Sequence, residues 1–220
     1  MHQSAFEHMA QCVDQYVPRT GRLRVVEVGS RRVNIQAHTH RELFASYDCE
    51  YIGVDIADGP NVDRVMTRPY RIPLRSNAAD VVLSGQAFEH IPFMWVSMSE
   101  IARVLKPNGH GLITVPSRGH RHGIQDCWRF YPDGMRALAA WSGLELLEAT
   151  TDFPPRAGGT RRHDYAAIDP AQYWGDTVGV FRKPTDYRRL RMAAVRSVTK
   201  LWANRAAASG VPPSRAHAGR

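Results

Sequence analysis

Four side chains that can ligate a metal ion or move a proton lie shortly after two apolar runs. They are Glu89, His90, His120 and His122. The first two follow residues 78–84, and the last two follow residues 111–116. If both runs are parallel strands, their carboxyl ends share the edge of the sheet where ligands bind. Carboxylate and imidazole groups suit a divalent cation, and a histidine can instead take a proton from a hydroxyl. The spacing predicts a metal centre or a general base.

A second set of residues fits a cofactor that contains a ribose. Gly29 lies at the end of the run 22–30, where the missing Cβ lets backbone approach a ligand closely. Asp55 ends the run 51–55, and a carboxylate there can accept both ribose hydroxyls. A dinucleotide fingerprint, G-x-G-x-x-G, is excluded because residues 31–33 of its loop are Arg, Arg and Val.

The elements that must position these groups alternate along the chain. Apolar runs predict strands at residues 22–30, 51–55, 62–65, 78–84, 111–116, 144–150 and 176–181. Helical spacing and helix-ending residues predict helices near the N-terminus and at residues 34–46, 93–105, 132–142 and 187–205. Residues 152–174, rich in Pro, Gly, Arg and His, are predicted to be a long loop. Strands that alternate with helices imply a mostly parallel sheet covered on both faces.

These motifs follow the order found in class I S-adenosylmethionine (SAM)-dependent methyltransferases. The chain resembles that family, in particular its type 11 members, over residues 22–150, through residues 27–30, 55, 84–92 and 103–117. The resemblance implies a Rossmann-like, mostly parallel seven-stranded sheet with helices on both faces. It implies SAM as the cofactor, held by Glu27, Gly29, Ser30, Asp55 and Gln86. The loop after Gly29 departs from the family because two further glycines are missing, and no acid before residue 78 is an obvious adenine ligand.

Residues 86–90 are similar to a motif of metal-dependent O-methyltransferases of the ubiquinone pathway and of small-RNA 3′ ends. Those enzymes carry Glu-x-x-Glu-His and a further histidine, and Gln86 replaces the first acid here. The resemblance implies a divalent cation such as Mg²⁺, held by Glu89, His90 and His120, with His122 as the alternative third ligand. It also implies Glu89, His120 and His122 as catalytic groups that activate an acceptor hydroxyl. In family members without a metal the same Glu-His pair packs and hydrogen-bonds, so both interpretations stay open.

The segment 126–134 resembles a D-x-W-R-F-x-P-x-G stretch of bacterial methyltransferases associated with polysaccharides. The mycobacterial methylmannose polysaccharide O-methyltransferases are the most specific similarity. The resemblance implies a saccharide acceptor bound by Asp126, Trp128 and Arg129. An aromatic ring can stack on a sugar, and charged groups can bind its hydroxyls. The same residues also suit a purely structural role, with Trp128 in the core and Arg129 paired to an acid.

The composition is that of a globular chain with a basic tail. The 220 residues, 43% hydrophobic and 23% charged, predict one α/β domain over residues 1–184 and a tail over residues 185–220. Ten of the 29 Lys and Arg residues, but one of the 21 acids, lie in residues 182–220. The main domain is therefore close to neutral, which argues against a nucleic-acid partner. The tail helix 187–205 is predicted to contact the domain, a second subunit of a homodimer, a membrane surface or RNA. Residues 206–220 are predicted to be disordered.

No apolar run is long enough to span a bilayer, and the N-terminus does not have the pattern of a secretory signal. Three scattered cysteines predict reduced thiols and a cytoplasmic protein. The function predicted from the sequence is SAM-dependent O-methylation of a saccharide hydroxyl, assisted by a divalent metal or a histidine. The alternatives are methylation of a phenolic small molecule, 2′-O-methylation of RNA, and SAM binding without catalysis.

Overall fold

The computed structural model describes residues 3–33, 38–152, 174–187 and 189–208. Their strands form one seven-stranded sheet in the order β3-β2-β1-β4-β5-β7-β6. The strands are β1 (Leu23–Val28), β2 (Cys49–Asp55), β3 (Arg64–Val65), β4 (Ala79–Gly85), β5 (Leu105–Arg118), β6 (Glu145–Thr151) and β7 (Gly175–Arg182). The first five pair in parallel, and β7 lies antiparallel between β5 and β6. The predicted Rossmann-like, mostly parallel sheet is confirmed.

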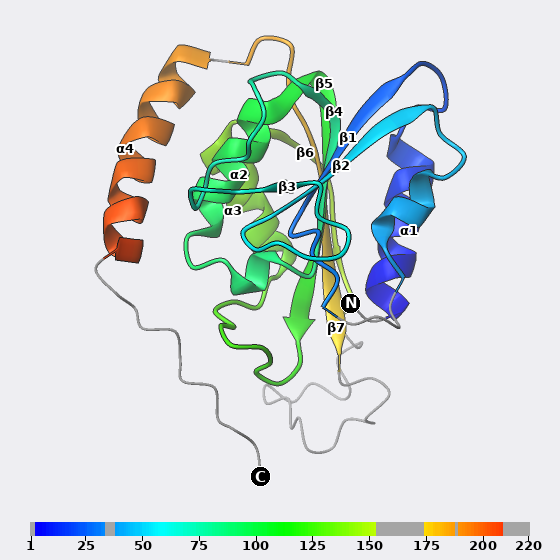
Figure 1. Ribbon diagram of the computed structural model, residues 1–220, viewed down its shortest axis with the longest axis horizontal. Coiled ribbons are helices and arrows are strands. Elements are labelled where there is room, and N and C mark those ends of the chain that lie inside the picture. Colours follow the sequence, from blue (N-terminus) through cyan, green and yellow to red (C-terminus); the bar gives the residue numbers. More distant parts are fainter. Residues whose placement is uncertain (1–2, 34–37, 153–173, 188, 209–220) are drawn as a thin grey trace.

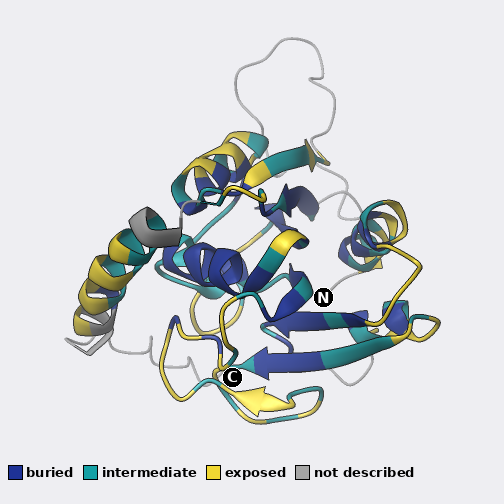
Figure 2. Ribbon diagram, turned by 90° about the horizontal axis from the view of Figure 1, so that it is seen from above, coloured by how far each residue is buried: buried dark blue, intermediate teal, exposed yellow. Residues whose placement is uncertain are grey.

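Helices cover both faces of the sheet (Figure 1). On one face lies α1 (Gln3–Tyr16), whose buried Met9 and Val13 pack against the apolar side chains of β1, β4, β5 and β7. On the other face lie α2 (Met94–Val104) and α3 (Pro132–Ser142), which enclose the larger core cluster. Seen from above, the central strands are almost entirely buried between these layers (Figure 2). The predicted helix-sheet-helix layering is therefore confirmed.

Two predicted boundaries are wrong. The predicted helix at residues 34–46 is, in its described part, only the 3₁₀ helix η1 (His40–Phe44), closed by i→i+3 backbone bonds such as Ala45 N–H to Glu42 O. The strand predicted at 111–116 begins at Leu105, directly after α2. Lys106 precedes Pro107, which disfavours helical backbone there, and Leu105 already pairs with Ala79 of β4. The turn signal at Pro107 thus lies inside an irregular strand.

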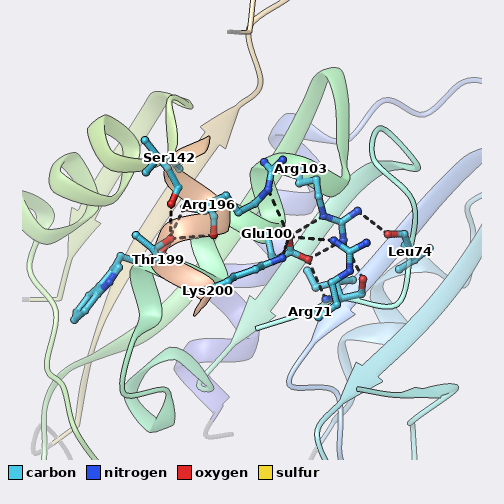
Figure 3. A network of polar contacts seen from close by, with 12 residues as sticks. Arg71, Leu74, Glu100, Arg103, Ser142, Arg196, Thr199 and Lys200 are labelled. Atoms are coloured by element: carbon cyan, nitrogen blue, oxygen red, sulfur yellow. Dashed lines mark hydrogen bonds and ion pairs between the residues drawn. The ribbon is translucent and has the colours of Figure 1, made fainter. Parts of the chain in front are cut away.

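The C-terminal helix α4 (Arg189–Ala208) packs against α2 on the outside of the domain (Figure 1). The contact centres on Glu100 of α2, which is completely buried and surrounded by basic side chains (Figure 3). Arg103 donates two hydrogen bonds to its carboxylate at 2.7 Å each, and Lys200 of α4 donates another. Burial raises the pKa of Glu100, but these hydrogen bonds outweigh it and hold the pKa below its ordinary value. One of the predicted roles of the tail helix, packing against the domain, is therefore observed.

The outer face of α4 carries three exposed apolar side chains, Val198, Leu201 and Trp202. A contact of this face with a membrane surface, RNA or a second subunit stays a prediction. None of the described helices combines the length and apolar character needed to cross a membrane. The predicted boundary at residue 184 lies in the connection between β7 and α4. Most of the predicted long loop, residues 152–174, lies outside the described residues. So does most of the predicted disordered end, residues 206–220.

Candidate functional site

The carboxyl ends of β1, β4 and β5 meet at one edge of the sheet, and the predicted site residues lie along it. β1 and β4 are neighbours although β2 and β3 lie between them in sequence, so the strand order switches direction there. Such a switch point is where open α/β sheets bind ligands. The start of α1 reaches the same edge (Figure 1), because the Ser4 hydroxyl donates to Asp176 of β7 at 2.8 Å.

Glu27 is buried near the end of β1 and is fully engaged inside the protein. Its Oε1 lies 2.7 Å from Nδ1 of His40, and its Oε2 accepts hydrogen bonds from the Tyr51 hydroxyl and the Asn61 amide at 2.7 and 2.9 Å. Burial, followed by the charge of Glu27, raises the pKa of Tyr51, so the hydroxyl remains a donor. Asn61 also donates to the backbone oxygen of Ser30 at 2.9 Å. Glu27 therefore acts through its neighbours to position the loop after β1.

Gly29 holds two parts of this edge close together. Its φ is 79°, in the left-handed region, and a Cβ built on it would lie 2.4 Å from Cβ of Ala87 in the turn after β4. No other residue type fits both the conformation and the space. The next residue, Ser30, is buried, and its Oγ has no hydrogen-bond partner among the described residues. The loop after β1 thus presents a hydroxyl that a ligand can engage.

Asp55 and Gln86 lie on either side of the switch point. The Asp55 carboxylate accepts the backbone N–H groups of Arg31 and Ala57, each at 3.0 Å, and each of its oxygens retains a second acceptor site for a ribose hydroxyl. Gln86 has a φ of 54°, and its amide donates to Asp176 at 3.0 Å. Asp176 therefore joins the turn after β4 to α1, a connection that the sequence analysis missed.

The residues of the predicted metal centre come together in part. Nε2 of His90 and Nε2 of His122 lie 3.6 and 3.9 Å from Oε1 of Glu89. Nδ1 of His90 is hydrogen-bonded to the backbone oxygen of Gln125, and Nδ1 of His122 lies 3.1 Å from a carboxylate oxygen of Asp126. Both rings turn Nε2 towards the carboxylate. The Nδ1 bond orients His90 as outer partners orient metal-ligating histidines, whereas Nδ1 of His122 makes no hydrogen bond among the described residues.

Glu89 is completely buried in η2 (Phe88–His90), and neither of its carboxylate oxygens has a hydrogen-bond partner among the described residues. Burial raises its pKa to about 8. Burial also lowers the pKa of His122, which favours the neutral ring that ligates a metal or accepts a proton. His120, the histidine predicted as third ligand, instead packs at a tilted angle against Trp174, with ring centroids 4.7 Å apart. The geometry favours His122 over His120 because only His122 faces Glu89.

The three residues predicted to bind the acceptor hold the loop between β5 and α3 in place. Asp126 accepts two hydrogen bonds from Arg129 at 2.6 and 2.8 Å and one from the His122 backbone N–H at 2.8 Å. Burial raises the pKa of Asp126, but these hydrogen bonds outweigh it and hold the pKa at about 2. Arg129 also donates to the backbone oxygen of His120, and the Trp128 indole donates to that of Ile91. Their polar groups organise the loop, and the structural interpretation of this stretch fits these contacts.

Buried side-chain atoms that lack hydrogen-bond partners gather at the same edge. Six of the described residues with such atoms lie along this edge, while others, such as Tyr47, lie elsewhere; the six are Ser30, His40, Glu89, Thr114, Ser117 and Arg118. Native proteins satisfy almost all buried polar atoms, and exceptions point to a missing ligand, ion or water. The sequence analysis missed the last three, although they end the apolar run 111–116 or directly follow it. This concentration makes the edge the candidate binding site.

Comparisons with known proteins agree with the fold. The family model described as a methyltransferase domain matches residues 36–113. No curated protein matches the chain. A chain of the complex between the Haloferax volcanii Trm112 methyltransferase activator and a protein described as a methyltransferase has 18% identity and a TM-score of 0.60, covering 82% of this chain and 91% of that one.

Two further structures show what the fold accommodates. The Burkholderia thailandensis 1,6-didemethyltoxoflavin-N1-methyltransferase, solved with its substrate and S-adenosylhomocysteine, has 14% identity and a TM-score of 0.59, covering 82% of this chain and 79% of that one. The [4+2]-cyclase SpnF has 16% identity and a TM-score of 0.57, covering 81% of this chain and 80% of that one. At these identities the likeness establishes the class I methyltransferase fold alone.

Proposed function

We propose that this chain is a SAM-dependent methyltransferase that transfers a methyl group to a hydroxyl of a saccharide. The observation that carries the proposal is the row of unsatisfied buried polar atoms at the switch point, in a sheet of the class I methyltransferase fold. The match of residues 36–113 to a methyltransferase domain supports the reaction class. S-adenosylhomocysteine bound to a structural neighbour supports the cofactor class.

In this proposal SAM lies across the carboxyl ends of β1 and β2. Gly29 gives the ligand access to the backbone, Ser30 offers a free hydroxyl, and Asp55 accepts from the ribose. Glu27 and Gln86 are positioning residues, because their polar groups are bound to other side chains of the protein. The two arginines after Ser30 replace the usual glycines. The Arg31 N–H is donated to Asp55, so other backbone N–H groups of this loop must bind the cofactor in place of a glycine-rich loop.

The acceptor hydroxyl is activated beside Glu89. In the transfer an O–C bond forms as the S–C bond of the sulfonium breaks, and the hydroxyl proton must leave. Nε2 of His122 is the nitrogen placed to accept that proton, because Nδ1 faces Asp126. Asp126, whose carboxylate lies 3.1 Å from Nδ1 on the other side of the ring, stabilises the imidazolium that results. His120 is not placed for either task in the described structure.

Glu89, His90 and His122 also fit a divalent cation. Their ligand atoms lie within 4.8 Å of one another, and a buried carboxylate without a partner is the group that a cation would satisfy. A bound cation would lower the pKa of an acceptor hydroxyl. Two imidazoles and one carboxylate favour Mn²⁺, Fe²⁺ or Zn²⁺ over Mg²⁺, which prefers oxygen ligands. We therefore propose a transition-metal ion where the sequence suggested Mg²⁺.

The saccharide acceptor rests on the resemblance of residues 126–134. Asp126, Trp128 and Arg129 contribute to it by shaping the loop that carries His122, since their polar groups are engaged inside the protein. A phenolic acceptor or RNA would require the same activation of a hydroxyl. Because a structural neighbour is named as a cyclase, SAM binding without methyl transfer is a second outcome to test.

The test measures transfer of a labelled methyl group from SAM to oligosaccharides, phenols and RNA. Each acceptor is assayed in EDTA and again after an excess of Mn²⁺ or Mg²⁺ is added. We expect label in a saccharide, strong loss of transfer in Glu89→Gln and His122→Ala, and little loss in the matched control His120→Ala. Transfer only after Mn²⁺ is restored supports the metal; transfer in EDTA leaves His122 as the base. Label in a phenol or RNA alone refutes the saccharide, and SAM binding without label in any class refutes the enzyme.

A further inference from the structure

Arg118, the last residue of β5, is a buried cation with no counter-ion among the described residues. Its side chain belongs to a residue that is only 7% exposed, and Nε and Nη1 have no hydrogen-bond partner. Of three buried acids at this edge, Glu89 lies near His90 and His122 and forms no ion pair with Arg118, and the other two are already hydrogen-bonded. Asp176 accepts from Gln86 and Ser4, and Asp126 accepts from Arg129.

Such a guanidinium cannot relieve its burial by losing its proton, because arginine stays charged in proteins. Removing an ion from water costs several kcal/mol unless a partner of opposite charge replaces the water. An uncompensated buried charge at the end of a central strand therefore indicates a partner that the described residues do not supply. The planar fork of arginine matches the two oxygens of a carboxylate or a phosphate.

The surroundings of Arg118 form a cradle of the right chemistry. The neighbouring Ser117 is 1% exposed, and its Oγ also has no hydrogen-bond partner among the described residues. Gly175 pairs with Arg118 across the strands, and a Cβ built on it would lie 2.7 Å from Nε of Arg118 and 2.8 Å from Oγ of Ser117. Glycine at the start of β7 thus leaves the space in which the guanidinium and the hydroxyl lie side by side.

The cradle adjoins the candidate site. Arg118 is followed by Gly119, whose backbone oxygen accepts from Arg129, and Arg129 in turn holds Asp126 beside His122. We propose that Arg118 and Ser117 bind an oxyanion, a carboxylate or phosphate group, of the molecule that occupies this edge. The inference rests on the proposed function for the source of that group, which is either the carboxylate of SAM or an acidic group on the acceptor.

The first test needs no ligand. Arg118→Met removes the buried charge and keeps an unbranched side chain, so the melting temperature of the unliganded protein should rise by about 2–4 °C. Arg118→Lys, which keeps the charge, should not show the rise. Sulfate should stabilise the wild type more than Arg118→Met when sodium chloride at equal ionic strength is the reference. A fall in the melting temperature of Arg118→Met, with equal responses to sulfate, would mean that Arg118 is a structural residue and overturns the proposal.

Calorimetry then separates the two sources. If Arg118 binds the cofactor, Arg118→Met weakens S-adenosylhomocysteine about tenfold or more and leaves decarboxylated SAM unaffected. If it binds the acceptor, affinity for S-adenosylhomocysteine is unchanged, and the wild type prefers a glucuronate-containing oligosaccharide over its glucose counterpart, a preference that the variant loses. Equal behaviour of both proteins with every ligand overturns the inference. Failure of the wild type to bind S-adenosylhomocysteine refutes the proposed function instead, and leaves the melting and sulfate results to decide on Arg118.

Discussion

Replacing Gly29 by alanine should damage the cofactor edge through two separable effects. A φ of 79° costs a side chain about 1–2 kcal/mol. The new Cβ would also lie 2.4 Å from Cβ of Ala87, against a normal carbon contact of about 3.5–4.0 Å. The turn after β4 must then move by about 1 Å, which overpacking experiments place at about 1–3 kcal/mol. The free energy of unfolding should fall by about 2–5 kcal/mol, and affinity for S-adenosylhomocysteine should fall at least about tenfold.

A second substitution separates the two effects. Ala87→Gly removes the atom that the new Cβ at position 29 would strike but leaves the backbone strain, so the double variant should recover about 1–3 kcal/mol relative to additivity. Gly21→Ala is the matched control, because Gly21 has a φ of 83° with nothing within 4 Å of a built Cβ. It should show the strain alone and bind S-adenosylhomocysteine normally. Urea unfolding and calorimetry give both quantities. A coupling energy below about 0.5 kcal/mol between positions 29 and 87 would refute the reasoning.

Two further predictions concern the contacts that hold the loop after β5 and the helix α4. Asp126→Asn removes the charge that pairs with the partly exposed Arg129, so the free energy of unfolding in urea should fall by about 2–3 kcal/mol. Methyl transfer should fall more than cofactor affinity, and unchanged transfer would exclude a role of Asp126 in orienting His122. Glu100→Gln leaves Arg103 and Lys200 without their buried partner and should cost about 3–5 kcal/mol, with faster proteolysis within α4. Lys200→Met, which removes only one of several cations, should cost clearly less, and equal losses would contradict the account of Figure 3.

Patterns in the sequence predicted where the strands lie better than they predicted the residues at which the strands begin and end. Apolar runs located the five interior strands because strands covered on both faces must be apolar. The edge strands β3 and β6 also follow apolar runs, although they are more exposed. The extent of β5 escaped the same reasoning, because Pro107 and Asn108 near its start are residues that favour turns. Its start is fixed by pairing with Ala79 of β4, a contact between distant residues that no local pattern encodes. The helix predicted at 34–46 is, in its described part, only a short 3₁₀ helix, because that part has no long apolar face to bury.

The choice of third histidine illustrates what spacing cannot decide. His120 and His122 lie in one loop, at similar distances from β5, and have the same chemistry. What separates them is Arg129, whose hydrogen bonds to the backbone oxygen of His120 and to Asp126 fold the loop so that His122 faces Glu89. The sequence analysis identified Arg129 and Asp126 as reactive-looking side chains, but their partners, and hence their roles, depend on the folded loop.

Residue type alone misleads at this edge because its polar groups divide into two sets. One set, with Glu27, Asp126 and Arg129, is satisfied inside the protein and holds loops in place. The other, with Ser30, Glu89 and Arg118, is buried and has polar atoms without a hydrogen-bond partner among the described residues. Charged side chains of the first set look catalytic in a sequence, whereas Ser30 and Arg118 look ordinary. Burying the second set costs stability in the unliganded protein, and that cost is recovered on binding. Substitutions should therefore act in opposite directions: removing a residue of the first set destabilises the free protein, and replacing Arg118 by Met stabilises it while weakening the complex.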